Sequence, residues 1–246
     1  MKAIILAAGF GRRLQPITNT VPKSMVPVKG IPLLLRSMDK IAALGVDEFV
    51  IVTGHMASYI HTNLGDSYKN IPIRFVENKE YEITNNIYSL WMASELIQDD
   101  TYLFECDLLY SEKLLESLCS SSADCGIVTS DFNRETMDGS VVAIDQNCNA
   151  VDLYLKKEQN EGFDYSDKRK TVNIYRFSAD FWCNAMVPAL AKEISAGNRN
   201  SYYELVLKEI MHSGKWNMKV VNVPEAYWCE IDDMDDLKRA EGSDLL

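Results

Sequence analysis

The sequence of 246 residues has no long apolar run and no surplus of positive charge. A membrane-spanning helix needs ~18 or more consecutive apolar residues, and no stretch of the chain approaches that length. There are 36 acidic and 25 basic residues, which give a net charge of −11. Proteins that bind nucleic acids display basic faces to the phosphate backbone. We therefore expect neither a membrane nor a nucleic acid among the partners.

Metal-binding cysteine motifs and an export signal are also missing. The six cysteines contain no C-x-x-C pair, and their spacing to the three histidines does not indicate a zinc site. The first apolar run is shorter than the ~7–15 residues of a signal-peptide core, and glycines and arginines follow it at once. These features predict free thiols in a reducing cytoplasm.

What is present in the first half is an alternation of strand-like and helix-like segments. Such alternation favours right-handed βαβ units, and hence an α/β fold with a doubly wound, mainly parallel sheet. The predicted strands cover residues 3–8, 49–53, 73–77 and 102–107, and the predicted helices cover 33–44, a short stretch from about 58, and 87–97.

The second half is less regular, and neither a repeat nor a low-complexity linker divides the chain. We expect one domain over residues 1–246, with halves of about 1–110 and about 111–246 and a small inserted β-region in the second. The predicted strands there are 125–130, 140–145, 151–156, 171–177 and 220–228, with a charged loop at 158–170 and helices at 179–193 and 202–212.

The strongest motif follows the first predicted strand. Gly9 and Gly11 permit a tight turn in which a ligand can approach the main chain. Arg12 and Arg13 add guanidinium groups that match phosphate oxygens, and Lys23 adds a compact positive charge. Backbone amides and cations gathered at one sheet edge indicate a triphosphate site.

Two common phosphate motifs do not match this turn. The pattern G-x-G-x-x-G fails at Leu14, and the P-loop pattern is absent. Instead, L-A-A-G-x-G-x-R-L followed by P, T and P-K resembles the sugar-1-phosphate nucleotidyltransferases and the related phosphocholine-type cytidylyltransferases. The matching residues are Leu6, Ala7, Ala8, Gly9, Gly11, Arg13, Leu14, Pro16, Thr18, Pro22 and Lys23.

This resemblance implies a Rossmann-like nucleotidyltransferase fold in which the first half binds the nucleotide and the second half binds the acceptor. It implies that Arg13 and Lys23 are catalytic and hold phosphates, while Mg²⁺ helps an acceptor oxygen attack the α-phosphorus and expel pyrophosphate. The implied nucleotide-binding residues are Leu6, Ala7, Ala8, Gly9, Gly11 and Arg12, together with Tyr81, Asn85 and Asn86.

Two aspartates match the metal ligands of that family. Asp107 ends a predicted central strand, at the edge where open α/β sheets bind ligands. Glu105 shares its face of the strand, but Asp107 lies nearer the loop and matches the family position. Asp232 resembles the late aspartate that completes the site, and two carboxylates suit Mg²⁺. The acids at 233, 235 and 236 are expected to cap the following helix or to be solvated.

The segment at 80–91 favours CTP as the nucleotide. Its N-I-Y-S-L run is similar to that of phosphocholine cytidylyltransferases. Asn85 and Asn86 offer the amide groups that a cytosine edge needs, although a helix-capping role is equally open for either residue.

For the acceptor, the run at 170–177 resembles cytidylyltransferases of phosphonate biosynthesis. It favours 2-aminoethylphosphonate over phosphocholine, with a sugar phosphate or a non-catalytic nucleotide-binding module as more distant alternatives. The partners are thus CTP and a small zwitterionic phosphonate or phosphate ester, and a homo-oligomer stays open. Family positions for the acceptor fall on Lys156, chosen over Lys157, and on Asn173, Tyr175, Tyr202, Glu204, Trp228 and Glu230.

Overall fold

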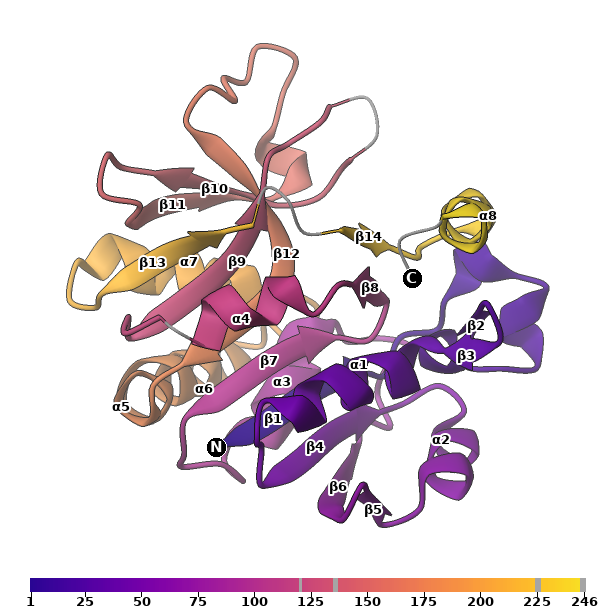
Figure 1. Cartoon of the computed structure of the whole chain (residues 1–246). Coiled ribbons are helices and arrows are strands. Elements are labelled where there is room, and N and C mark those ends of the chain that lie inside the picture. The colour runs from indigo at the N-terminus through magenta and orange to yellow at the C-terminus, as the bar shows by residue number, and fades with distance from the viewer. Residues whose placement is uncertain (120, 135–136, 224–226, 244–246) are drawn as a thin grey trace.

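A largely parallel sheet forms the centre of the molecule (Figure 1). The computed structural model describes residues 1–119, 121–134, 137–223 and 227–243. Four strands run parallel in the order β7, β1, β4, β6. They are β1 (Lys2–Ala7), β4 (Glu48–Thr53), β6 (Ile71–Glu77) and β7 (Thr101–Glu105). The predicted central sheet is confirmed.

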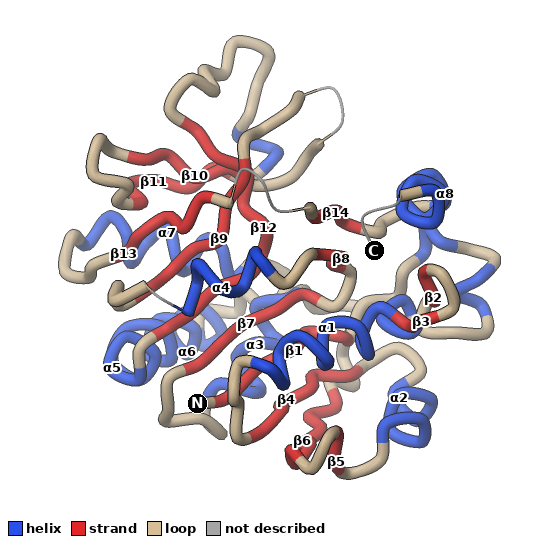
Figure 2. The backbone as a smooth tube through the Cα atoms, in the orientation of Figure 1, coloured by secondary structure: helices blue, strands red, loops and turns tan. Residues whose placement is uncertain are grey.

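Helices cover both faces of this sheet (Figure 2), as the predicted doubly wound arrangement requires. One face carries α1 (Leu33–Ala43), α2 (Ala57–Leu64) and α4 (Lys113–Cys119). The other carries α3 (Asn86–Ser94), α5 (Ala179–Phe181), α6 (Val187–Ser195) and α7 (Tyr203–Ser213). Alternate residues of β1 supply the two cores, since Ile4 packs with the second group and Ile5 with the first.

The second half of the chain adds mostly antiparallel strands to the same sheet. They are β9 (Cys125–Ser130), β10 (Val141–Ile144), β11 (Ala150–Tyr154), β12 (Lys168–Phe177) and β13 (Met218–Asn222). β12 is antiparallel to β7, β9 and β10, so it belongs to both halves of the sheet. Its register with β9 shifts between Thr171 and Tyr175, where Asn173 has a left-handed backbone with φ of 59°.

Short strand pairs lie at the edge of the fold where the acidic segments meet. β8 (Leu108–Tyr110) pairs antiparallel with β14 (Trp228–Glu230), and the Ile231 amide donates to the Asp107 carbonyl at 2.9 Å. After β14 comes α8 (Met234–Gly242). The remaining short strands are β2 (Pro27–Val28), β3 (Ile31–Pro32) and β5 (Ser67–Tyr68).

Several predicted boundaries were wrong. The strand expected at 220–228 is two strands, because β13 pairs with β9 whereas β14 pairs with β8; residues 224–226 lie outside the described part. The strand expected at 102–107 stops at Glu105, and Asp107 lies in the turn before β8. The helix expected at 179–193 contains a wide π turn at Trp182–Met186, just before Pro188, which has no N–H to continue the ladder.

Within the described ranges, every helix is too short or too polar to cross a bilayer.

Candidate active site

The glycine-rich turn is packed directly against Lys23. Gly11 has φ of 70°, a conformation that favours glycine, and its carbonyl accepts a hydrogen bond from the Thr18 hydroxyl at 2.8 Å. A Cβ added at Gly11 would lie 2.8 Å from the Lys23 Cβ. The glycine therefore allows the turn to sit on the lysine stem, and the stem carries the ammonium toward the acidic segments.

Lys23 joins the two aspartates predicted to hold metal. Its Nζ lies 2.6 Å from Asp107 Oδ2 and 2.6 Å from Asp232 Oδ1. An Arg13 guanidinium nitrogen lies 3.0 Å from the other Asp232 oxygen. The four residues predicted as catalytic thus form one cluster, although 84 residues separate Lys23 from Asp107 and 209 separate it from Asp232. The β8 and β14 pairing explains this, because each aspartate flanks one of those strands.

The charges in this cluster stabilise one another. Burial alone would lower the pKa of Lys23, but Asp107 and Asp232 outweigh it and raise the pKa above its ordinary value. Burial alone would raise the pKa of Asp232, but Lys23 and Arg13 lower it. Lys23 and Asp232 are therefore both ionised at neutral pH.

The donor set of this cluster suits a hard divalent cation. Both carboxylates face one point, where Lys23 now supplies the positive charge, and carboxylate oxygens are the ligands that Mg²⁺ prefers. In the part of the chain that the structure describes, no group of three or more His, Cys, Asp or Glu side chains converges on a metal position. One or two carboxylates completed by phosphate oxygens and waters is the usual protein site for Mg²⁺.

A cavity of about 420 Å³, here called the central cavity, opens beside the cluster. It brings together residues from both halves of the chain. Of the predicted site residues, it is lined by Leu6, Ala8, Gly9, Arg13, Tyr81, Asn85, Asn86, Asp107, Asn173, Tyr202, Glu204, Glu230 and Asp232.

The other predicted residues lie around this cavity rather than on its wall. Ala7 and Tyr175 are buried in the core. Arg12 lies over the Phe10 ring at 5.2 Å from its centroid. Lys156 is exposed and forms an ion pair with Asp138. Gly11 packs against the Lys23 side chain, as described above. Trp228 lines a neighbouring cavity.

Sequence reasoning missed or set aside several residues on the wall of the central cavity. Asn78 follows β6 directly, so its position at the end of a parallel strand was a usable signal. Glu105 was considered only as a metal ligand. No local pattern marked the others, which come from the α3 region and a loop of the second half. The additional wall residues are Asn78, Thr84, Ser89, Glu105, Asp138 and Gly139.

Asn85 and Asn86 line the central cavity and also form hydrogen bonds that stabilise the fold. The Asn85 side chain caps α3 by accepting from the Asn86 amide at 2.8 Å. Asn86 ties α3 to α7, because its side-chain oxygen accepts from the Tyr203 amide at 3.1 Å and its Nδ2 donates to Glu204 at 3.2 Å. Of the later acids, Asp233 and Asp236 form the predicted cap of α8.

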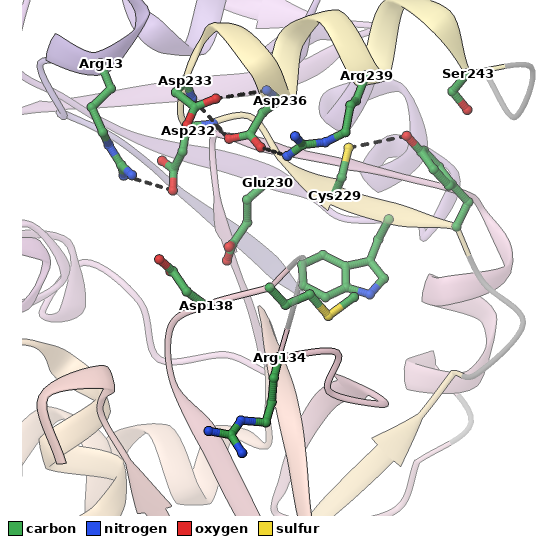
Figure 3. Close-up of a pocket in the computed structure, with 13 residues that line it drawn as sticks. Arg13, Arg134, Asp138, Cys229, Glu230, Asp232, Asp233, Asp236, Arg239 and Ser243 are labelled. Atoms are coloured by element: carbon green, nitrogen blue, oxygen red, sulfur yellow. Dashed lines mark hydrogen bonds and ion pairs between the residues drawn. The ribbon is translucent and has the colours of Figure 1, made fainter. Parts of the chain in front are cut away.

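A second cavity of about 640 Å³, here called the outer cavity, adjoins the first (Figure 3). Arg13, Asp138, Glu230 and Asp232 line both cavities. Figure 3 shows Arg13 reaching Asp232 above the open space that Asp138 and Glu230 also line. The two cavities therefore meet at the charged cluster.

A buried lysine fastens the wall between the cavities. Lys170 of β12 is 1% exposed, and its Nζ donates to the Thr171 carbonyl at 2.9 Å and to Glu230 Oε1 at 3.2 Å. The Nζ also lies 5.4 Å from the centroid of the Trp228 ring. Gly139 has φ of 100°, and a Cβ there would lie 3.0 Å from the same Nζ. One cation thus joins β12, β14 and the loop at Gly139.

Comparisons with known proteins agree with this geometry. A family model described as "Nucleotidyl transferase" matches residues 2–244. The CMP-5'-(3-aminopropyl)phosphonate synthase of Streptomyces rubellomurinus is 28% identical over 241 residues, covering 98% of this chain and 38% of that protein. The CTP:phosphoglutamine cytidylyltransferase of Campylobacter jejuni is 25% identical over 259 residues, covering 97% of this chain and 98% of that protein.

A third relative matches only in part. The 2-aminoethylphosphonate cytidylyltransferase of Lancefieldella rimae is 34% identical over 112 residues, covering 45% of this chain and 44% of that protein. The chain thus spans 38% of the length of the Streptomyces protein, whereas the Lancefieldella match is confined to less than half of each protein.

Solved structures share the fold at low sequence identity. CTP:phosphocholine cytidylyltransferase from Streptococcus pneumoniae aligns with a TM-score of 0.76 at 21% identity, covering 98% of this chain and 97% of that one. A UDP-glucose pyrophosphorylase complexed with UDP-glucose aligns with a TM-score of 0.81 at 17% identity, covering 98% and 96%. These likenesses show the Rossmann-like nucleotidyltransferase fold.

Proposed function

Because the chain belongs to the nucleotidyl transferase family, we propose that it transfers CMP from CTP to 2-aminoethylphosphonate and releases pyrophosphate. The observation that carries the proposal is the cluster of Arg13, Lys23, Asp107 and Asp232 at the junction of two cavities. The choice of a cytidylyl group and a phosphonate is supported by relatives whose names state those reactants.

Asp107 and Asp232 would hold Mg²⁺ in this reaction. When bound, the ion supplies positive charge that neutralises the triphosphate and the entering acceptor oxygen. The residues of the chain provide the remaining positive charge. Arg13 is solvent-facing and reaches phosphate oxygens as a fork, whereas Lys23 lies deeper and is restrained by both aspartates.

The chain needs no general base for this step. A phosphonate oxygen is already ionised at neutral pH, so the attacking group carries its own negative charge. The contribution of the protein is then to position two anions and to stabilise the charge on the departing pyrophosphate. Arg13 and Lys23 are the cations placed for that role, and Ala8 and Gly9 of the glycine-rich turn line the cavity beside them.

For the nucleotide, we place the cytosine against the wall formed by Tyr81, Asn85 and Asn86. All three line the central cavity on the side of the glycine-rich turn, whose Ala8 and Gly9 also line it. The Asn86 amide group is engaged at both ends, with Glu204 and with the Tyr203 amide, whereas Asn85 uses only its oxygen, in the cap of α3. The Asn85 Nδ2 and Tyr81 are therefore the freer groups for reading the base.

The aromatic side chains favour a primary ammonium over a trimethylammonium on the acceptor. A quaternary ammonium cannot donate hydrogen bonds and needs several aromatic faces around it. Lys170 already covers the Trp228 ring, and the Arg199 guanidinium lies 5.2 Å from the centroid of the Tyr88 ring. Of the predicted acceptor aromatics, only Tyr202 lines the central cavity, with 42% of its surface exposed.

Phosphocholine is the second candidate acceptor. It is favoured by that exposed Tyr202 ring and by the name of a structure that shares the fold.

The test is pyrophosphate release from CTP, UTP and dTTP, each with 2-aminoethylphosphonate, phosphocholine and a sugar 1-phosphate. We expect turnover with CTP and 2-aminoethylphosphonate. Faster turnover with phosphocholine would select the second candidate, and no release with any pair would overturn the enzymatic proposal.

A variant pair checks the metal assignment. Asp107→Asn should lower kcat/KM about 100-fold or more, because the amide keeps the shape but loses the charge that a cation requires. Asp235→Asn is the matched control, since that side chain is 76% exposed beyond the cluster and pairs with Lys238. Equal activity of the Asp107 variant and the wild type would refute the metal assignment.

A further inference from the structure

The central cavity has an uneven balance of charge. Six carboxylates line it, and most of them have a cationic partner within the chain. Asp107 and Asp232 face Lys23. Two others are paired farther out, Asp138 with Lys156 and Glu230 with Lys170.

Glu105 and Glu204 are the exceptions among the carboxylates of that wall. Within the described residues, neither forms an ion pair with a lysine or an arginine. Glu204 is only 5% exposed, and its Oε2 accepts one hydrogen bond from the neutral Asn86 amide. Both side chains line the central cavity. Buried carboxylates without a partner are rare in proteins, because leaving water without compensation is costly.

These two side chains come from different elements that meet at the cavity. Glu105 is the last residue of β7, beside Leu6 of β1, and Glu204 lies in the first turn of α7. Asn86 fixes the position of Glu204 by bonding both its carboxylate and the adjacent Tyr203 amide. The pair therefore faces the cavity from a wall that Asn86 holds in place, and among the described residues neither carboxylate is in an ion pair.

We propose that Glu105 and Glu204 form a subsite for the primary ammonium group of the acceptor, with Glu105 as the residue that makes the subsite selective. The proposal rests on the proposed function and deepens it by assigning the two ends of the acceptor. The phosphonate lies at the cluster of Arg13 and Lys23, and the ammonium lies at Glu105 and Glu204. An ammonium donates to carboxylate oxygens directly, and such charge-assisted bonds are the stronger kind.

Lys170 is what directs the ammonium to this subsite. Glu230 lines the same cavity and carries the same charge, but its Oε1 is bonded to Lys170 at 3.2 Å. Glu230 is therefore already neutralised and offers the acceptor less than the unpaired glutamates do. The predicted role of Glu230 as a direct acceptor ligand thus passes to Glu105, with Glu204 keeping its predicted role.

The experiment compares acceptors with and without the ammonium group in wild-type and variant enzymes. The acceptors are 2-aminoethylphosphonate and ethylphosphonate, at saturating CTP. The variants are Glu105→Gln and Glu204→Gln, with Glu209→Gln as the matched control because that carboxylate lies on α7 outside the cavity and pairs with the exposed Lys192. Glutamine keeps the shape and removes mutual repulsion, so we expect both glutamine variants to fold, and thermal unfolding verifies this.

We expect each glutamine variant to raise KM for 2-aminoethylphosphonate about tenfold or more, because a hydrogen bond to a charged group is lost. KM for ethylphosphonate should stay unchanged. Glu105→Asp, which keeps the charge, should recover part of the loss. Equal changes with both acceptors would mean a structural role and would overturn the subsite.

Failure of the subsite and failure of the proposed function are distinguishable. If the wild type uses 2-aminoethylphosphonate but the variants do not discriminate between the two acceptors, only the subsite is wrong. If the wild type releases no pyrophosphate with either phosphonate, the proposed function is wrong. The subsite then falls with it.

Discussion

Burial of Glu204 without a cationic partner has a cost that depends on pH. Burial raises the pKa of this carboxyl above its ordinary value of 4.5, and hydrogen bonds from its own backbone and from Asn86 offset this only in part. The Glu204 carboxyl group therefore binds a proton more tightly in the folded state than in the unfolded state. The free energy of unfolding falls as pH rises from about that ordinary value through the raised pKa, and the loss then stays constant.

Glu204→Gln should remove this pH-dependent loss. We expect the variant to be more stable than the wild type at pH 8, with a smaller difference or none at pH 5, in urea denaturation without ligands. Glu209→Gln on the exposed part of the same helix is the control, because its partner Lys192 is also exposed. An identical stability difference at both pH values would contradict the assigned burial cost.

At the residue scale, the sequence reveals groups whose chemistry is tied to a motif. Asp107, Asp232, Arg13 and Lys23 were predictable because they stand at fixed positions beside recognisable strands and turns. Lys170 was not, since a lysine on a strand normally faces solvent, and its partner lies 60 residues away. Ion pairs of that kind depend on the tertiary fold.

At the scale of the elements, the glycine-rich turn requires glycine at position 11. Gly11→Ala should destabilise the protein by about 1–3 kcal/mol, because its left-handed backbone disfavours a side chain and the new Cβ would meet Lys23 at 2.8 Å. Gly9→Ala is the control for folding, since nothing lies within 4 Å of a Cβ there. Thermal or urea unfolding measures both, and equal stability of the two variants would contradict the packing argument.

Element prediction succeeded where the residues themselves decide the structure. β1, β4 and β9 are short segments with apolar centres, and these were placed within one or two residues. Element prediction failed where pairing with a strand distant in sequence sets the boundaries of the element. The segment at 220–228 has strand-forming residues at both ends, but the change of partner from β9 to β8 divides it. α4 was missed because seven residues give too little periodicity.

For the whole molecule, the Lys170 and Glu230 pair joins strands that are far apart in sequence. Lys170→Met should cost about 3 kcal/mol or more, because it leaves Glu230 without its partner in a largely buried place. The double variant Lys170→Met with Glu230→Gln should recover much of this loss, since removing both charges of a buried pair is often close to neutral.

Urea denaturation of the wild type, both single variants and the double variant measures that coupling. Additive losses in the double variant would show that the two side chains stabilise the fold independently. Recovery of stability would support the ion pair as the connection between β12 and β14.

The overall architecture was predictable, and the assembly of the site across it was only partly so. Alternating apolar and helical patterns predict a doubly wound sheet, and a parallel sheet predicts its binding edge. Which loops close around that edge depends on how β12 meets β7 and β9, and the sequence contains no local signal for that pairing.

Because β12 is hydrogen-bonded to β7 on one side and to β9 on the other, the two halves of the chain cannot be exchanged between relatives as separate modules. A chimera joined near residue 111 would bring a foreign β12 against the resident β7, and its pairing would have to reproduce the register shift around Asn173. A slip of one residue would turn the side chains of that strand to the opposite face. Recombination of chain halves within this family is therefore constrained by strand register. A new acceptor preference is more easily reached by substituting residues that line the central cavity than by exchanging whole segments between relatives.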